Sequence, residues 1–202
     1  MTAIRLGTAL AALIVPLAAA AAESRYTDLV GRSCKFEPIG TGLGDDEYQT
    51  KRCPGLGSAI VKTSSEHTQV ALGFEWPRTR PVDGVLRNWS IGTRMEWRGT
   101  AGPKGFEPYA ATVRVLFPKD GGPNTERQLL AIMRVTRGQA CVVGVVDIVA
   151  NPNAYDLARR VADGKARAAD CRSVQPTVEG APSTWTADLL SRLPKRGERS
   201  GG

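Results

Sequence analysis

The amino-acid sequence predicts an α+β fold: a mainly antiparallel β-sheet, one C-terminal α-helix at about 152–163, and two disulfides. Three observations support this expectation. Short segments rich in β-branched and aromatic residues follow one another through most of the chain, separated by turns that contain glycine and proline. A single late segment has the spacing of an amphipathic helix, and the chain contains four cysteines.

Eight segments have the composition of β-strands. They are 33–37, 48–53, 59–62, 68–74, 94–98, 109–117, 128–135 and 141–149. The last of these is almost entirely apolar, which predicts a central strand, and the short connection 137–140 predicts an antiparallel meander with the strand before it. The stretch from Pro77 to Gly92 has no clear alternation, and we expect irregular loop there.

The predicted helix begins after Asn151, a favourable N-cap residue, with Pro152 at the first helical position. Gly164 is expected to terminate it. Its apolar residues follow the i, i+3, i+4, i+7, i+8 spacing of one buried face; they are Ala154, Leu157, Ala158, Val161 and Ala162.

Residues 1–22 have the three parts of a secretory signal peptide: a short region with Arg5, an uncharged run rich in alanine and leucine, and small residues at the end. We expect cleavage after residue 22. A retained membrane anchor is the alternative, but a spanning helix needs roughly 20 strongly apolar residues, and this run is short and interrupted by Pro16. The sequence therefore predicts a periplasmic or secreted protein with no transmembrane segment after cleavage.

The remainder is expected to be a single globular domain, 23–172, followed by a mostly disordered tail, 173–202. Prolines and glycines are frequent in that tail. The alternative for part of it is one short docking turn formed by Trp185, Leu189, Leu190 and Leu193.

In an exported chain, four cysteines predict disulfides. Three pairings are possible. Local geometry favours Cys34–Cys53 and Cys141–Cys171, because each pair would close a short excursion between neighbouring elements. A zinc site is the alternative, but the chain has no C-x-x-C spacing and a single histidine, His67, so no metal is expected.

The formal net charge is +7, which favours anionic partners such as lipid head groups, lipopolysaccharide or acidic glycans of the cell envelope. Export makes nucleic acid an unexpected partner. The alternative is that the charge only keeps the protein soluble.

The best candidate binding surface is a segment in which tryptophans and arginines alternate. Aromatic faces stack on sugars, and guanidinium groups bind anionic oxygens through paired hydrogen bonds. The candidate residues are Trp76, Arg78, Arg80, Arg87, Trp89 and Arg94. The alternative is that Trp97 belongs to the core and the arginines are solvated.

A second candidate is a polar cleft around Asp147, which lies in an otherwise apolar strand and would be costly to bury without a partner. Arg114 and Arg134, each between apolar neighbours in an adjacent predicted strand, are the expected partners. The alternatives to a functional cleft are a structural ion pair and an exposed position at the strand end.

No catalytic residue and no cofactor are expected. His67 lies in a polar turn without the partners of a catalytic triad. Asp45, Asp46 and Glu47 are adjacent in a glycine-rich turn, which indicates a solvated loop and not two opposed catalytic carboxylates. The glycines at 40–44 precede a predicted strand, whereas a phosphate-binding loop precedes a helix.

Several blocks of the chain are distinctive, namely Tyr26–Leu29, the first cysteine (Cys34), Arg52–Gly55, Met95–Arg98, Cys141–Asp147 and the stretch from Asn151 to Cys171. Together they resemble a family of uncharacterised exported proteins of Gram-negative bacteria. The resemblance covers nearly all of the mature domain except the tail. It implies a shared domain with two disulfides, and no activity is assigned to that family.

The sequence thus favours a non-enzymatic periplasmic binding or accessory protein with anionic cell-envelope partners. The alternatives are a small cofactor-independent hydrolase that works through carboxylates, and a hydrolase inhibitor.

Overall fold

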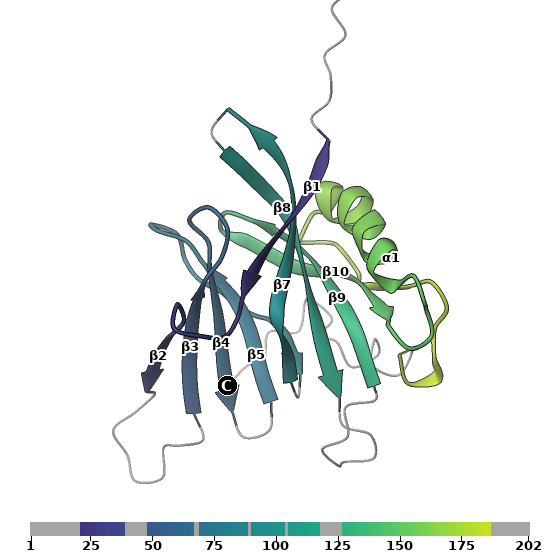
Figure 1. Ribbon diagram of the computed structural model, residues 1–202, viewed down its shortest axis with the longest axis horizontal. Coiled ribbons are helices and arrows are strands. Elements are labelled where there is room, and N and C mark those ends of the chain that lie inside the picture. Colours follow the sequence, from purple (N-terminus) through teal and green to yellow (C-terminus); the bar gives the residue numbers. More distant parts are fainter. Residues whose placement is uncertain are drawn as a thin grey trace, which may run out of the picture.

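The computed structural model describes residues 21–38, 48–66, 69–88, 90–103, 105–117 and 127–186. These residues form two β-sheets and one helix (Figure 1). The strands are β1 (Ala22–Asp28), β2 (Lys35–Pro38), β3 (Tyr48–Pro54), β4 (Ile60–Glu66), β5 (Gln69–Glu75), β6 (Val82–Asn88), β7 (Ser90–Gly102), β8 (Gly105–Phe117), β9 (Arg127–Thr136), β10 (Gln139–Asp147) and β11 (Thr177–Glu179). The helix α1 (Ala154–Val161) continues into a π-helical segment, η2 (Ala162–Ala166).

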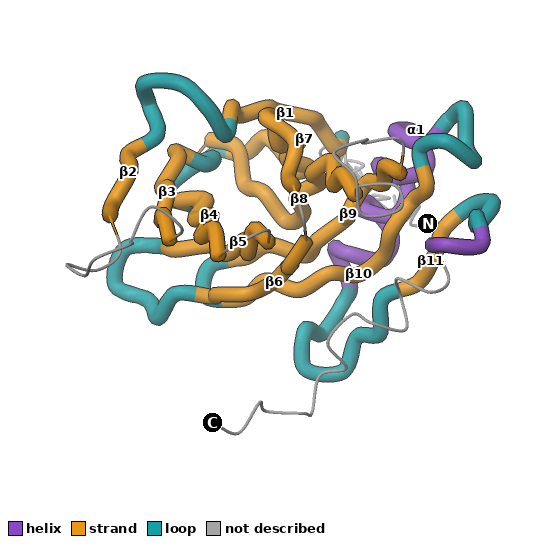
Figure 2. The backbone as a smooth tube through the Cα atoms, turned by 90° about the horizontal axis from the view of Figure 1, so that it is seen from below, coloured by secondary structure: helices purple, strands orange, loops and turns teal. Residues whose placement is uncertain are grey.

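The two sheets face each other across the main core (Figure 2). One has the strand order β1-β7-β8-β9-β10-β11 and the other the order β2-β3-β4-β5-β6. All paired strands are antiparallel except β10 and β11. Inward-facing side chains such as Phe74, Met95 and Trp97 are fully buried between the sheets. The expected antiparallel-rich β structure with a C-terminal helix is confirmed, but it consists of two sheets and not one.

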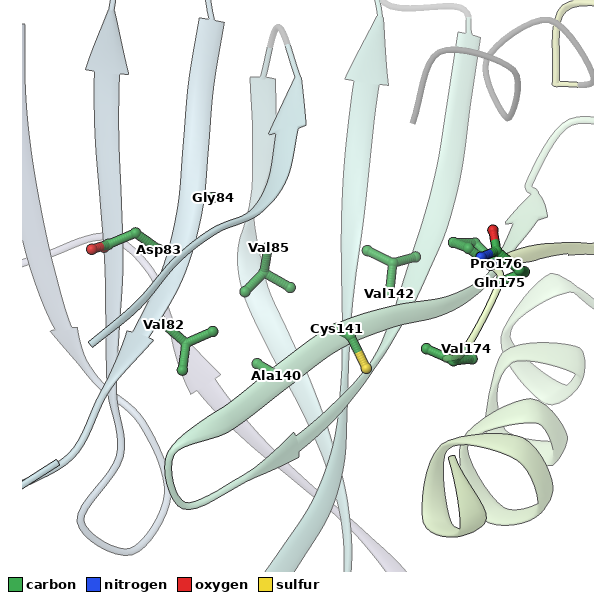
Figure 3. Close-up of a pocket in the computed structure, with 10 residues that line it drawn as sticks. All are labelled: Val82, Asp83, Gly84, Val85, Ala140, Cys141, Val142, Val174, Gln175 and Pro176. Carbon is green, nitrogen blue, oxygen red and sulfur yellow. The ribbon is translucent and has the colours of Figure 1, made fainter. Parts of the chain in front are cut away.

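At one side of the sandwich, β6 and β10 lie next to each other without pairing as strands. Figure 3 shows Val82 and Val85 of β6 near Ala140 and Val142 of β10, around a cavity of about 180 Å³. Apolar packing therefore joins the described parts of the two sheets along this seam.

Strand β6 lies in the stretch from Pro77 to Gly92, where irregular loop was expected. The register of its pairing with β5 shifts between Leu72 and Phe74, and Gly84 has φ +62°. An irregularity of this kind interrupts the two-residue alternation of side chains between the two faces. The pattern that identifies strands in a sequence is lost there for that reason.

The helix begins at Ala154 and not at Pro152, with Asn153 at its N-cap, and the side chain of Asn151 has a different role. Asn151 Nδ2 donates to the carbonyl oxygen of Asp147 at 2.9 Å, and Asn151 Oδ1 accepts from the backbone N–H of Ala181 at 2.8 Å. The predicted N-cap residue instead joins the end of β10 to the segment that follows β11.

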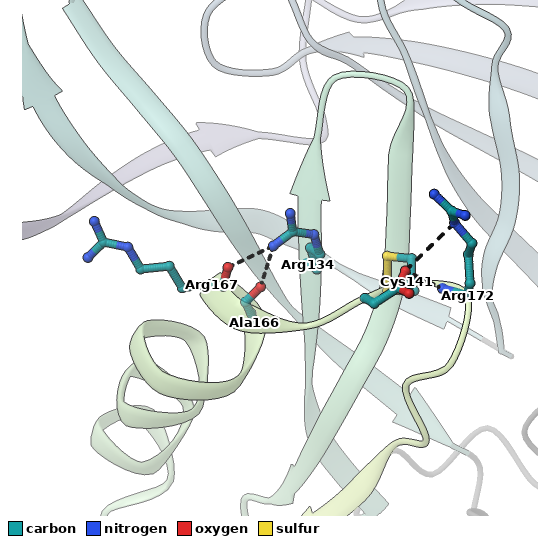
Figure 4. Close-up of a disulfide and its surroundings, with 7 residues drawn as sticks. Arg134, Cys141, Ala166, Arg167 and Arg172 are labelled. Atoms are coloured by element: carbon teal, nitrogen blue, oxygen red, sulfur yellow. Dashed lines mark hydrogen bonds and ion pairs between the residues drawn. A yellow bond between two sulfur atoms is a disulfide. The ribbon is translucent and has the colours of Figure 1, made fainter.

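The helical segment also passes through Gly164, the expected terminator, and η2 ends at Ala166. At this end Arg134 of β9 donates to the carbonyl oxygens of Ala166 and Arg167, at 3.0 and 2.8 Å (Figure 4). Unpaired carbonyl groups and a partial negative charge make the C-terminal end of a helix favourable for a cation. A side chain from the sheet, and not the local sequence, thus satisfies this helix end.

Both expected disulfides are present. Cys34 pairs with Cys53, with the Cα atoms 4.1 Å apart, and Cys141 pairs with Cys171, with the Cα atoms 5.6 Å apart. The second bond ties the chain after the helix to β10 (Figure 4). Two disulfides indicate an oxidising compartment outside the cytoplasm. None of the described helices is long and apolar enough to span a membrane.

The expected tail does not begin at residue 173. Strand β11 pairs with β10 from Gly144 to Val146, and the ring of Trp185 packs against Phe117 with the ring centroids 5.5 Å apart. The segment 173–186 therefore belongs to the domain. Residues 187–202 lie outside the described residues, as do residues 1–20 of the expected signal peptide, the turns that hold Asp45–Glu47 and His67, and Trp89.

Candidate functional site

A groove of about 450 Å³ lies beside α1 on the outer face of the six-stranded sheet. Its polar and aromatic lining residues come from four elements of the chain. They are Tyr26 on β1, Thr93, Arg94 and Glu96 on β7, Thr112 and Arg114 on β8, and Tyr155 on α1. Leu116 and Leu130 supply apolar surface between them.

The groove owes its shape to an irregularity in β7. Ile91 is paired with Val115 and Met95 with Val113, so three residues of β7 stand opposite Arg114 alone. A Cβ atom on Gly92, the first of the three, would lie 3.0 Å from the Cβ of Arg114. Bulges redirect side chains and are frequent beside functional sites. This bulge brings residues 92–94 of β7 to the groove, next to Arg114.

Two arginines of the groove carry charges that no carboxylate of the described residues neutralises. The guanidinium of Arg94 lies over the ring of Tyr26, 4.3 Å from its centroid. Asp28 stands opposite Arg94 in the register of β1 and β7, yet the two form no ion pair. Arg114 is exposed and has no hydrogen-bond or ion-pair partner among the described residues. Both guanidinium groups are therefore available to an anionic ligand.

The charge of Glu96, by contrast, is compensated. Its Oε1 atom accepts a hydrogen bond from Arg159 Nε at 2.7 Å and one from the hydroxyl of Ser24. The hydrogen bond with Glu96 raises the pKa of Arg159 above its usual value. Arg159 also donates to the hydroxyl of Tyr26 at 3.2 Å. Glu96 and Arg159 thus hold Tyr26 in place against the helix.

A second polar contact fixes the helical segment on the sheet. Arg98 of β7 binds Asp163 through two nitrogens, and the hydroxyl of Tyr109 donates to the same carboxylate at 2.6 Å. Burial would raise the pKa of Asp163, but the hydrogen bonds from Arg98 and Tyr109 outweigh it and lower that pKa. Burial and the bond to Asp163 raise the pKa of Tyr109 to about 12. The wall of the groove that α1 forms is therefore anchored by charge as well as by apolar packing.

This arrangement suits a ligand with both anionic oxygens and a flat, weakly polar face. Tyr26 and Tyr155 are 42% and 46% exposed and offer two aromatic surfaces. The hydroxyl of the buried Thr112 has no side-chain partner among the described residues. The described chain holds no group of three residues able to bind a metal ion.

The tryptophan and arginine segment does not form one surface. Trp76 is buried and stacks on Phe74, with the ring centroids 6.1 Å apart. Arg78 and Arg80 are exposed in the turn after it, and Arg87 lies on the outer face of the five-stranded sheet, beside the cavity that Lys62 lines. Among the described candidates of this segment, Arg94 is the one that lines the groove. Trp97 is part of the core, as the alternative interpretation held.

The cleft expected around Asp147 is absent from the described structure, and neither Arg114 nor Arg134 contacts Asp147. Its carboxylate is fully buried and accepts hydrogen bonds from two backbone N–H groups and two hydroxyls. Arg134 caps the helix, and Arg114 faces the groove. The prediction was wrong because neutral donors from 149–150 and 183–186 satisfy the carboxylate without a cation.

Sequence reasoning missed most of the groove, namely Tyr26, Glu96, Thr112, Tyr155 and Arg159. A glycine inside a strand indicates a bulge, and Gly92 lies inside β7, but the sequence predicts the strand only from residue 94 and so does not reveal this signal. Comparison with protein-family models, with curated proteins and with solved structures finds no match to this chain.

Proposed function

We propose that this chain is an exported, non-enzymatic binding protein whose groove takes an acidic glycan of the bacterial cell envelope. The observation that carries the proposal is that two arginines without an ion pair among the described residues, Arg94 and Arg114, line one groove together with two exposed tyrosines. The periplasm as its location, and its kinship with the exported family that it resembles, are parts of the same proposal.

The anionic character of the ligand follows from the charges of the groove. Glu96 is the one carboxylate among the lining residues of the described chain, and Arg159 neutralises it. Arg94 and Arg114 then leave the groove positive. Guanidinium groups bind carboxylate or phosphate oxygens through two parallel hydrogen bonds, which gives direction as well as attraction.

The shape of the groove favours a glycan over a flat lipid surface. A concave site lined by aromatic rings and a few polar groups is typical of small-molecule and oligosaccharide recognition. Tyr26 and Tyr155 lie on β1 and α1, so a ring bound between them would be contacted from two elements. The hydroxyl of Thr112 adds one neutral hydrogen-bonding group.

The test is binding of an acidic oligosaccharide, tri-galacturonate, measured by calorimetry at low and at high salt. We expect binding that weakens with salt, no binding of a neutral glucan of the same length, and at least about tenfold weaker binding by R94Q/R114Q. The matched control is R80Q/R87Q, which removes the same charge from exposed positions outside the groove and should bind as the wild type does.

Three results would overturn the proposal. The first is unchanged binding by R94Q/R114Q, and the second is binding that salt does not weaken. The third is binding to vesicles of anionic phospholipid with no binding of the oligosaccharide, which would make a lipid surface the ligand.

Export is tested separately. Strand β1 begins at Ala22, so cleavage after residue 22 keeps the pairing of Glu23–Asp28 with β7. Mass spectrometry of protein from the periplasmic fraction should find a mature chain that begins at Glu23 and has no free thiol. Accumulation in the cytosol with reduced cysteines would contradict this part of the proposal.

A further inference from the structure

A second cavity, of about 260 Å³, opens between the two sheets at one end of the sandwich. It opens on the inner face of the six-stranded sheet, whereas the groove lies on the outer face, and Gly92 is the one lining residue that the two share. Its lining residues include Lys51 on β3, Thr63 on β4, Ile91 on β7, Phe36 on β2, and Val30 between β1 and β2. The cavity is thus a mouth that leads into the space between the sheets.

Lys51 points into this mouth. Residues that are paired across antiparallel strands share a face of the sheet. Lys51 is paired with Thr63, and Thr63 with Leu72, which is a fully buried core residue. The side chain of Lys51 therefore lies on the inner face of the five-stranded sheet and not on its outer face.

The charge of Lys51 has no partner among the described residues. The lysine on the neighbouring strand behaves differently: Lys62 faces outward and forms ion pairs with Asp83 at 3.0 Å and Glu75 at 3.9 Å. Burial lowers the pKa of Lys51 below its usual value. A partly buried cation without a counterion is costly, and a bound anion would remove that cost.

Hydrogen-bonding and apolar groups surround Lys51 in a consistent order. Thr63, beside it in the register, is buried, and its hydroxyl has no side-chain partner among the described residues. At the rim, Phe36 and Val30 are 65% and 46% exposed. Exposed apolar side chains at the rim of a cavity favour contact with an apolar group. The mouth therefore offers a cation and a hydroxyl inside, and at its edge apolar surface beside the polar Gln49 and Ser90.

We propose that this mouth binds a fatty acid, with the carboxylate head group inside the mouth. The carboxylate accepts hydrogen bonds from Lys51 and Thr63, and the acyl chain lies against Phe36, Val30 and Ile91. The volume is slightly below the range of about 300–1,000 Å³ that is usual for small-molecule pockets. The head group and the first part of the chain therefore enter, and the rest of the chain follows the apolar rim.

The experiment is calorimetric titration of the mature, oxidised protein with decanoate below its micelle concentration. Wild type should bind decanoate. Decanol lacks the charge and acetate lacks the acyl chain, so the affinity for each should be at least tenfold lower. K51M should lose at least tenfold in affinity, and T63V several-fold. The matched control K62M removes an outward lysine and should bind as wild type, as should R94Q/R114Q, whose groove is a separate site.

Folding of the variants is checked by circular dichroism. K51M is expected to melt at a higher temperature than wild type, since the substitution removes an unpaired, partly buried charge. Decanoate should raise the melting temperature of wild type and not that of K51M. Equal decanoate affinity in K51M and wild type would overturn the proposal, as would equal affinity for decanol and decanoate. A Lys51 pKa at or above 10.5 in the free protein, measured by NMR, would show that carboxylates of the chain already pair with Lys51, and it would also overturn the proposal.

Discussion

Asp147 offers the most direct test of how the end of the chain is held. Its Oδ1 atom accepts the backbone N–H groups of Val149 and Ala150 at 2.8 and 3.0 Å. Its Oδ2 atom accepts the hydroxyl groups of Ser183 and Thr186, the latter at 2.8 Å. This fully buried carboxylate therefore joins β10, the turn after it and the segment that follows β11.

Replacement of Asp147 by asparagine keeps the shape and removes the charge. A hydrogen bond to a charged group contributes about 1.5–3 kcal/mol, whereas one between neutral groups contributes about 0.5–1.5 kcal/mol. The two backbone bonds to Oδ1 persist in D147N as neutral bonds, and each weakens by about 1 kcal/mol. We expect the free energy of unfolding to fall by about 2 kcal/mol at pH 7.

The pH dependence supplies an independent signature. Burial would raise the pKa of Asp147, but the hydrogen bonds from Ser183, Ala150, Thr186 and Val149 outweigh it and lower that pKa. A carboxyl group with a lower pKa in the folded than in the unfolded state stabilises the fold at pH values above its unfolded pKa of about 4. That contribution is lost as the pH falls through the folded pKa. The wild type should therefore lose more stability than D147N on acidification below about pH 4.

The assay is urea denaturation with linear extrapolation, at pH 7 and at several lower values. D156N is the matched control, because Asp156 is exposed on α1 and its pair with Arg159 is a surface contact worth less than about 1 kcal/mol. A loss of less than about 0.5 kcal/mol in D147N at pH 7, or an acid dependence equal to that of the wild type, would refute the reasoning.

Three further predictions follow from single positions of the fold. Arg78 has φ +60° in a turn that is closed by a hydrogen bond from the N–H of Thr79 to the carbonyl oxygen of Trp76. R78G should relieve the backbone strain and raise the free energy of unfolding by about 1 kcal/mol; no gain in thermal or urea denaturation would contradict that strain. A Cβ on Gly99 would lie 2.4 Å from a backbone oxygen, whereas Gly164 has open space around it. The free energy of unfolding should therefore fall by at least about 2 kcal/mol in G99A and rise by up to about 1 kcal/mol in G164A, and equal melting temperatures of the two variants would refute this difference. Replacement of both Cys141 and Cys171 by serine should cost roughly 3 kcal/mol in urea denaturation, and a cost near zero would show that the bond does not stabilise the domain.

The candidate site illustrates why sequence alone was insufficient. Arg94 and Arg114 were both named from the sequence, yet for two different surfaces. Their meeting depends on the bulge at 92–94, which changes the register of β7 against β8. Tyr26 and Tyr155, at opposite ends of the domain sequence, carry no local pattern that indicates a shared groove.

The partners of buried polar groups could not be predicted from the sequence either. Arg134 and Asp147 were expected to pair because both lie among apolar residues, but their positions along β9 and β10 are far apart: Arg134 is opposite Cys141, and Asp147 is opposite Leu129. Because the register separates them, each forms hydrogen bonds with other groups nearby. For Arg134 these are helix carbonyls, and for Asp147 they are backbone and hydroxyl donors.

What the sequence by itself determined is local: the wealth of β-forming segments, one amphipathic helix, and cysteines whose spacing allows two short-range bonds. Each of these depends on residues close together in the chain, where periodicity and turn chemistry act. The tertiary structure alone decided the division into two sheets, the strand at 82–88, the docking of 173–186, and the grouping of Arg94, Arg114, Tyr26 and Tyr155. These depend on strand register and on bulges, which set the direction of every side chain and arise from contacts between distant segments.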